Sequence, residues 1–297
     1  MRILISGASG LIGSALRPAL AAAGHATAAL VRGASASEDV QWKPGAWLDP
    51  QAIGGFDAIA HLAGKNISGR WTEEFKRAVL ESRVEGTRTV ATAAAESFRA
   101  RGAPRVLVAA SAIGYYGNRG EEVLTESSGP GEGFSSYLCE AWEAAALPAV
   151  EAGMRVVTLR IGVVLAKEGG ALKAMLPAFR LGLGGRVGDG QQYWSWVALD
   201  DAAGAMAFAL TDDSLSGVVN AVAPQPVRNR EFACELGRAL QRPAIFPVPG
   251  LVVRMAFGEM GEELLLASAR VSSGKLEAAG YGFRHPRLAE ALATIFS

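Results

Sequence analysis

The chain has 297 residues, half of them hydrophobic, so one large or two smaller domains can bury a sizeable core. Its 29 lysines and arginines balance its 29 aspartates and glutamates, which argues against nucleic acid or an anionic membrane as the main partner. Two cysteines and three histidines, none at ligand spacing, predict neither a disulfide framework nor a metal site.

The first predicted elements form a strand–helix–strand unit. Residues 2–6 are an apolar run that ends at a glycine, which is typical of a strand buried on both faces of a parallel sheet. Residues 11–23 have helical character and stop at Gly24, and residues 26–31 predict the second strand. Glycines and charged residues interrupt this apolar region too often for a signal peptide or a membrane span, so we expect a soluble, cytoplasmic protein.

The same alternation continues along the chain. We expect strands at residues 56–62, 105–110 and 154–161, and helices at residues 72–80, 84–99 and 136–152. Strands that alternate with helices predict an α/β fold with a Rossmann-type, doubly wound parallel sheet.

After about residue 164 the pattern becomes irregular. Residues 166–197 read as an excursion from the sheet, before a return through a helix and a last strand. Residues 226–297 are mostly helical in character. We therefore expect a nucleotide-binding domain over residues 1–225 and a smaller C-terminal lobe over residues 226–297, on the substrate side, to which the excursion contributes.

The stretch "GASGLIG" lies between the first strand and the first helix. In a dinucleotide-binding turn Gly7 permits the sharp bend, Gly10 lets the backbone approach a pyrophosphate, and Gly13 lets helix and strand pack closely. The helix N-terminus then offers free N–H groups to the phosphates. The predicted phosphate-binding segment is Gly7, Ser9, Gly10, Leu11, Ile12 and Gly13. The alternative is a purely structural turn.

Arg32 follows the second strand, where NAD-binding proteins usually carry an acidic residue for the ribose hydroxyl. A guanidinium at this position can instead pair with a 2′-phosphate. The sequence therefore favours NADP(H) over NAD(H), and the alternative is a solvated surface arginine.

Six stretches of the chain together resemble one family. They are "GASGLIG" (7–13), "AHLAGKNISGRWT" (60–72), "ESRVEGT" (81–87), "SAIGYYG" (111–117), "GLGGRVGDGQQYWSWVALDD" (182–201) and "FGEMGEELLLASARVSSGKLEAAGYGFRHPRLAEAL" (257–292). The chain resembles the extended, atypical short-chain dehydrogenase/reductases, in the epimerase-like subgroup that has its own small C-terminal domain. The resemblance spans essentially the whole chain.

The resemblance implies further cofactor-binding residues. Leu62, Ala63 and Gly64 end the third strand where such proteins pass the adenine ribose and the pyrophosphate. Arg83 matches an arginine that reaches the cofactor, and Val164 falls where backbone groups meet the nicotinamide. The alternatives are an ordinary strand exit, a solvated helix arginine and plain strand packing.

The resemblance implies chemistry that this chain only partly supports. Short-chain dehydrogenases use a serine or threonine, a tyrosine, and a lysine four residues after the tyrosine that lowers the tyrosine pKa. Ser111 and Tyr137 are the candidate catalytic residues. Ala141 stands where the lysine is expected, so the tyrosine–lysine pair is broken.

Two functions are consistent with these residues. One is an NADP(H)-dependent oxidoreductase or epimerase that acts on a small polar carbonyl or hydroxyl substrate, for example a sugar nucleotide. The other is a non-catalytic NADP(H)-binding regulator or sensor, which the missing lysine favours. The aromatic loop at residues 188–196 suits a sugar-like ligand or an anchor in the core equally well. A homodimer whose interface is formed by the predicted helices at residues 84–99 and 136–152 is a further option.

Overall fold

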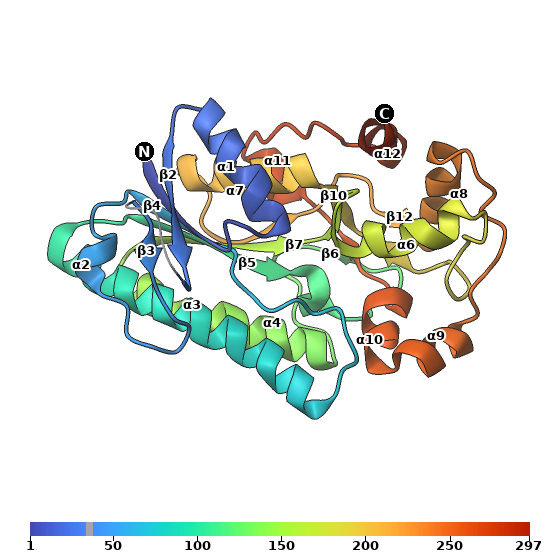
Figure 1. Cartoon of the computed structure of the whole chain (residues 1–297), viewed down its shortest axis with the longest axis horizontal. Coiled ribbons are helices and arrows are strands. Elements are labelled where there is room, and N and C mark those ends of the chain that lie inside the picture. The colour runs from blue at the N-terminus through green and yellow to red at the C-terminus, as the bar shows by residue number, and fades with distance from the viewer. Residues whose placement is uncertain (34–37) are drawn as a thin grey trace.

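Seven parallel strands form the central sheet of the computed structural model, which describes residues 1–33 and 38–297 (Figure 1). They are β1 (Arg2–Ser6), β2 (Ala26–Val31), β3 (Val40–Gln41), β4 (Ala58–His61), β5 (Val106–Ala112), β7 (Arg155–Ile161) and β11 (Gly217–Ala221). Their spatial order is β3-β2-β1-β4-β5-β7-β11, so the winding reverses between β1 and β4. Ligands of such sheets bind beyond the carboxyl ends of the strands at this reversal. The predicted Rossmann-type sheet is confirmed.

Helices cover both faces of the sheet (Figure 1). One face carries α1 (Leu11–Ala22), α7 (Leu199–Thr211) and α11 (Gly274–Ala278), and the other carries α2 (Pro50–Ile53), α3 (Glu73–Arg101), α4 (Phe134–Ala144) and α5 (Leu147–Glu151). Side chains of β1 alternate between the two layers: Ile3 and Ile5 belong to one apolar cluster and Leu4 to the other, all without exposure. This burial on both faces explains the continuous apolar runs of the strands.

The helix α3 corrects the prediction of two helices at residues 72–80 and 84–99. It runs unbroken from a Thr72 N-cap, whose hydroxyl accepts from the Phe75 N–H, to Gly102 in the left-handed region. Ser82 lies in the region expected to break the helix, but its hydroxyl donates to the Val79 carbonyl of the preceding turn. A serine that bonds in this way is accommodated inside a helix.

The predicted helix at residues 136–152 is instead divided into α4 and α5. The division falls just before Pro148, which lies in the first turn of α5. Proline has no N–H to donate and its ring clashes with the carbonyl four residues earlier, so the first helix ends at Ala144.

The remaining elements build the second lobe and its connections. They are η1 (Ile113–Tyr116), β6 (Val123–Leu124), β8 (Val163–Leu165), α6 (Gly170–Arg180), β9 (Tyr193–Trp194), β10 (Trp196–Ala198), β12 (Val227–Arg228), α8 (Asn229–Ala239), α9 (Gly250–Phe257), α10 (Glu259–Gly261), η2 (Glu262–Leu266), β13 (Arg270–Val271) and α12 (Leu288–Phe296). A separate apolar cluster joins α6, α8 and α12, so the mostly helical C-terminal lobe is confirmed. Among the helices of residues 1–33 and 38–297, none is long and apolar enough to cross a membrane.

Candidate functional site

The glycine turn between β1 and α1 has no room for side chains. Gly7 has a φ of +69°, and a Cβ on it would lie 2.8 Å from the Leu62 carbonyl carbon. A Cβ on Gly13 would lie 2.2 Å from the Gly7 carbonyl oxygen. The Gly10 N–H donates to the same oxygen at 2.9 Å. Gly7 therefore makes the sharp bend, and Gly13 the close approach of helix and turn, that are typical of a dinucleotide-binding turn.

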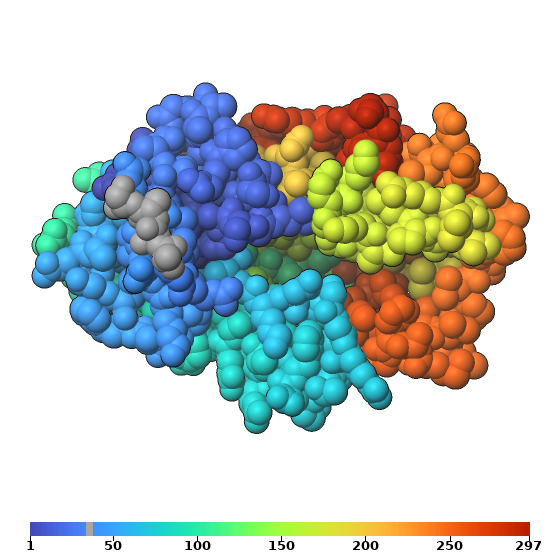
Figure 2. All heavy atoms as spheres, in the orientation of Figure 1, coloured from blue at the N-terminus to red at the C-terminus, as the bar shows by residue number. Residues whose placement is uncertain are grey.

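The N-terminus of α1 is open to an anion. Its N-cap is Gly10, which has no side chain to accept the first N–H groups, and the first turn contains no acidic residue. Ser9 and Gly10 are exposed, while Leu11 and Ile12 are half-buried. Figure 2 shows the molecular surface hollowed beside this N-terminal (blue) part, between it, the cyan segment and the yellow-green segment. The helix dipole and the free N–H groups suit phosphate oxygens at this place.

Leu62, Ala63 and Gly64 follow β4 directly and lie against the glycine turn. A Cβ on Gly7 would lie 2.9 Å from the Ala63 nitrogen, so the two backbones are in contact. A Cβ on Gly64 would lie 3.5 Å from the Arg83 guanidinium carbon, which belongs to α3. The structure thus brings together the predicted residues of the β1, β4 and α3 segments.

Arg83 holds the backbone after β4. Its Nη1 donates to the Lys65 carbonyl at 2.8 Å, and its guanidinium lies 4.9 Å from the Trp142 ring centroid. Burial lowers the pKa of Arg83 below its ordinary value. Within residues 1–33 and 38–297 it forms no salt bridge, so its positive charge is available beside the predicted dinucleotide path.

Val164 and Arg32 lie at two further edges of this region. Val164 is the middle residue of β8, and a Cβ on Gly170 would lie 3.4 Å from its carbonyl oxygen. A Cβ on Gly169 would in turn lie 2.9 Å from Cδ1 of Leu11, at the start of α1. Arg32 is exposed at the end of β2 and makes no ion pair with the described part of the chain.

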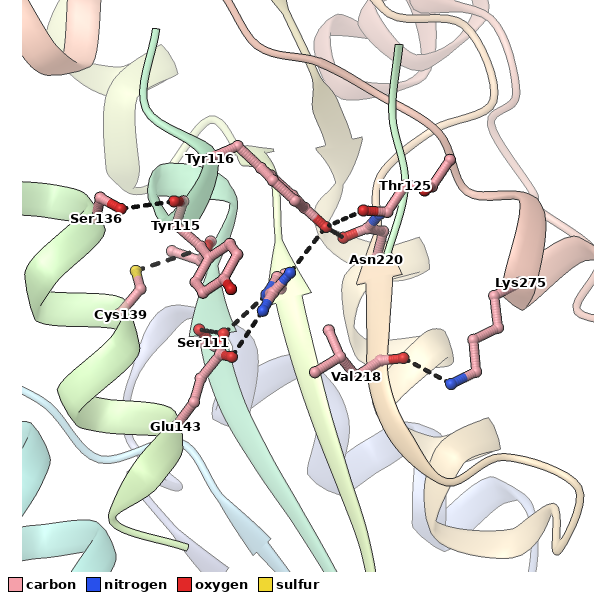
Figure 3. Close-up of polar contacts among 12 residues, drawn as sticks. Ser111, Tyr115, Tyr116, Thr125, Ser136, Cys139, Glu143, Val218, Asn220 and Lys275 are labelled. Atoms are coloured by element: carbon pink, nitrogen blue, oxygen red, sulfur yellow. Dashed lines mark hydrogen bonds and ion pairs between the residues drawn. The ribbon is translucent and has the colours of Figure 1, made fainter. Parts of the chain in front are cut away.

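Ser111 belongs to a buried polar network rather than to an open surface (Figure 3). It lies near the end of β5, and its hydroxyl donates to Glu143 Oε1 of α4 at 2.6 Å. Arg160 of β7 binds the same carboxylate in a bidentate way, with Nε and Nη2 each 2.8 Å from an oxygen. The Ser111 proton is therefore already engaged, which leaves the oxygen only as an acceptor.

Arg160 connects this carboxylate to two tyrosines. Its Nη1 lies 3.1 Å from the Tyr116 hydroxyl, and its guanidinium carbon lies 3.3 Å from the Tyr115 ring centroid. The Tyr116 hydroxyl also donates to Asn220 on β11 at 2.7 Å (Figure 3). Burial opposes the charge of Arg160, but its hydrogen bonds to Glu143 raise the pKa of the guanidinium above its ordinary value. The network thus links β5, α4, β7 and β11 at the carboxyl edge of the sheet.

Tyr137 lies on a different face of α4. Its side chain is 58% exposed, and its hydroxyl makes no hydrogen bond to any residue that the structure describes. The face that meets β5 and η1 carries Ser135, Cys139 and Glu143, at intervals of four residues. Burial raises the pKa of the Cys139 thiol to about 12. The helix α4 contains no lysine or arginine, and Ala141 occupies the position four residues after Tyr137. No cation of α4 therefore lies beside Tyr137.

The aromatic loop at residues 188–196 proves to be an anchor in the core. Trp194 and Trp196 are buried among the side chains of the second lobe, and the Trp196 indole donates to the Gln225 carbonyl. Tyr193 alone is half-exposed, between the guanidinium groups of Arg228 and Arg270. Of the two interpretations of this loop, core packing accounts for both tryptophans.

The segment of α10 and η2 contacts the first turns of α3 and α4. Glu263 accepts the N–H groups of Phe134 and Ser135 at 2.8 and 2.7 Å, and Glu259 pairs with Lys76 at 3.0 Å. Glu263 therefore meets the positive end of α4, whereas Glu259 meets the ammonium group of a side chain in the first turn of α3. The two carboxylates fix this segment of the C-terminal lobe against the helices that border the site.

The sheet order, the glycine turn and the open helix N-terminus at the reversal point define a dinucleotide-binding α/β protein. Residues 3–221 match the model of the NAD dependent epimerase/dehydratase family, and residues 248–295 match a domain of unknown function, DUF1731. The chain belongs to the NAD dependent epimerase/dehydratase family. The resemblance stated from the sequence is confirmed.

Relatives extend over nearly the whole chain. Epimerase family protein MT2273 of Mycobacterium tuberculosis is 44% identical and aligns with 98% of this chain and 96% of its own length. Human epimerase family protein SDR39U1 is 38% identical, with 99% of both chains aligned. The crystal structure of its isoform 2 with NADPH superposes with a TM-score of 0.89 at 35% identity, over 100% of this chain and 99% of that one. A nucleoside-diphosphate sugar epimerase structure from Corynebacterium glutamicum gives 0.80 at 34% identity over 100% of this chain and 58% of that one.

Proposed function

We propose that this protein binds NADP(H) and catalyses hydride transfer to or from a carbonyl or hydroxyl carbon of a small polar substrate. The observation that carries the proposal is the bare first turn of α1, above glycines that leave no room for a side chain. Gly10, Leu11 and Ile12 would hold the pyrophosphate, and Leu62–Gly64 with Arg83 would border the adjoining ribose. When bound, the nicotinamide supplies the hydride donor or acceptor.

Arg32 supports NADP(H) over NAD(H). It is exposed at the end of β2, and no carboxylate of residues 1–33 or 38–297 pairs with it. A forked guanidinium can bind a phosphate with two parallel hydrogen bonds. The human relative was crystallised with NADPH, which agrees with this preference.

Replacing Arg32 with alanine is expected to raise the Kd for NADPH about tenfold, because one charge-assisted phosphate contact is lost. The Kd for NADH should change by less than about twofold. Titration of both cofactors by fluorescence measures the two constants. Arg99→Ala is the control variant. It removes one positive charge from the last turn of α3 and should leave both dissociation constants unchanged. Equal losses for NADPH and NADH would contradict the role of Arg32.

A second candidate is an NADP(H)-binding regulator without turnover. The face of α4 that meets β5 favours this regulatory function. Ser135 and Cys139 lie one helical turn apart on that face, and neither side chain is the phenol or the cation of a tyrosine–lysine pair. The Ser111 hydroxyl is bonded to Glu143, and Tyr137 has no cation beside it on α4. Ser111 and Tyr137 stay predictions for proton transfer under the first candidate.

A turnover assay separates the two candidates. Purified protein with NADPH and a panel of aldehydes, ketones and sugar nucleotides is followed by absorbance and product analysis. Under the catalytic candidate at least one substrate should consume NADPH at a rate that Ser111→Ala lowers about 100-fold, within the range expected when a proton-transfer contact is lost. Tight NADPH binding with no product across the panel supports the regulator.

A further inference from the structure

Ser6 and His61 form a buried pair beneath the predicted dinucleotide path. Ser6 is the last residue of β1 and His61 the last of β4, they are paired in the sheet, and neither is exposed. The Ser6 hydroxyl oxygen lies 2.7 Å from His61 Nδ1. It also accepts the N–H groups of Leu62 and Ala63 at 3.1 and 3.2 Å. The pair therefore touches the turn that the cofactor site requires.

The hydrogens of this arrangement can be assigned by counting donors. A serine hydroxyl has one proton, and two backbone N–H groups already point at its oxygen. This count favours a serine proton donated to His61 Nδ1, and we assign it so: the neutral ring then carries its hydrogen on Nε2, which has no hydrogen-bond partner among the described residues. Burial lowers the pKa of His61 to about 4, which agrees with a neutral ring at physiological pH. Trp42 and Gly86 are among its neighbours, and burial is the one cause of this shift among the described residues.

The position of the turn depends on this pair. Leu62 N–H has a second acceptor in the Ser6 carbonyl, but Ala63 N–H has Ser6 Oγ as its sole acceptor within the described residues. The Leu62–Ala63 peptide borders the glycine turn, because a Cβ on Gly7 would lie 2.8 Å from the Leu62 carbonyl carbon and 2.9 Å from the Ala63 nitrogen. We propose that Ser6 and His61 are positioning residues for NADP(H): the imidazole orients the serine hydroxyl, and the hydroxyl holds Ala63 against the glycine turn. The proposal rests on the NADP(H) binding proposed above.

Ser6→Ala tests the first half of this inference. The Kd for NADPH should rise about tenfold, because Ala63 N–H loses its acceptor and the turn relaxes into the cofactor path. Ser97→Ala is the matched control: its buried hydroxyl donates to the Ala103 carbonyl at 2.8 Å, far from the site. Both variants should lower the Tm, but only Ser6→Ala should weaken NADPH binding. An unchanged Kd in folded Ser6→Ala, or an equal loss in Ser97→Ala, overturns the proposal.

Substitutions of His61 test the second half and serve if Ser6→Ala does not fold. His61→Leu removes the acceptor and should raise the Kd about as much as Ser6→Ala does. His61→Asn places an amide oxygen near the position of Nδ1 and should restore most of the affinity. The double variant Ser6→Ala/His61→Leu should bind NADPH no more weakly than either single variant, since both act through one contact. Additive losses, or no recovery with asparagine, contradict the pair. Absence of NADPH binding in the unmodified protein would instead refute the proposed function.

Discussion

Replacing Glu143 with alanine is expected to lower the free energy of unfolding by about 3–5 kcal/mol, the cost of removing one partner of a buried ion pair. Arg160 is 3% exposed and would keep its charge without the bidentate carboxylate. Ser111 would lose its acceptor at the same time. Urea denaturation followed by circular dichroism measures the change.

The double substitution Glu143→Leu/Arg160→Met is the control for this prediction. It removes both charges and fills similar volume, so most of the stability should return. If Glu143→Ala lowered the free energy of unfolding by less than about 1 kcal/mol, or if the double variant lost as much as Glu143→Ala, the ion pair would not be the source of the stability that the network provides.

Gly13→Ala is expected to have the largest effect on cofactor binding, with a rise of about 100-fold in the NADPH Kd. The added Cβ would lie 2.2 Å from the Gly7 carbonyl oxygen and 2.8 Å from Ala8 Cα, and both are backbone atoms. Relief therefore requires α1 to move away from the turn that holds the phosphates. Fluorescence titration of NADPH gives the constant.

Gly129→Ala provides the comparison, because a Cβ at Gly129 meets nothing within 4 Å. It should bind NADPH like the unmodified protein and unfold at nearly the same temperature. If Gly13→Ala also kept its affinity within about threefold, the glycine turn would not be the phosphate site.

The parts of the fold that depend on local pattern could be predicted from the sequence. The central residues of β1, Ile3–Ile5, are apolar because they are buried on both faces, and the positions of Gly10 and Gly13 relative to Gly7 are set by contacts within seven residues. Gly7 itself is also constrained by the distant Leu62–Ala63 peptide. Two predicted helix boundaries were wrong, although the residues found at these places are also local features of the sequence. Ser82 bonds back to the Val79 carbonyl inside the continuous helix α3, and Pro148 divides α4 from α5.

The interior of the site could be predicted only in part. The face that α4 turns toward β5 is set by packing, for example by the bond from the Trp142 indole to Thr87, and no periodicity within the helix reveals it. The family resemblance places Tyr137 at the tyrosine position, although Ala141 breaks the tyrosine–lysine spacing, but the contacts with β5 and η1 come from Ser135, Cys139 and Glu143. Local pattern gave no sign of the part that Glu143 takes in the network.

Partners that are distant in sequence were missed for the same reason. Arg160 and Glu143 lie on different elements, and Ser6 and His61 are 55 residues apart. Ser6 and His61 meet because the parallel strands β1 and β4 end at a common edge of the sheet, and Glu143 meets Arg160 because α4 packs on β5, the strand beside β7. A charged residue inside an otherwise apolar strand, as Arg160 is in β7, was the one available signal of a buried partner.

The two sides of the C-terminal lobe are attached in different ways. On one side β13 pairs with β6, and the Ser195 hydroxyl bonds the backbone of Ala269 and Val271. On the other side the contacts of Glu259 and Glu263 are made to a lysine and to helix ends. Water can replace these polar contacts at a small net cost, and salt screens them. The contacts along α10 are therefore more sensitive to salt than those along β13, so high ionic strength should loosen the α3–α4 side first.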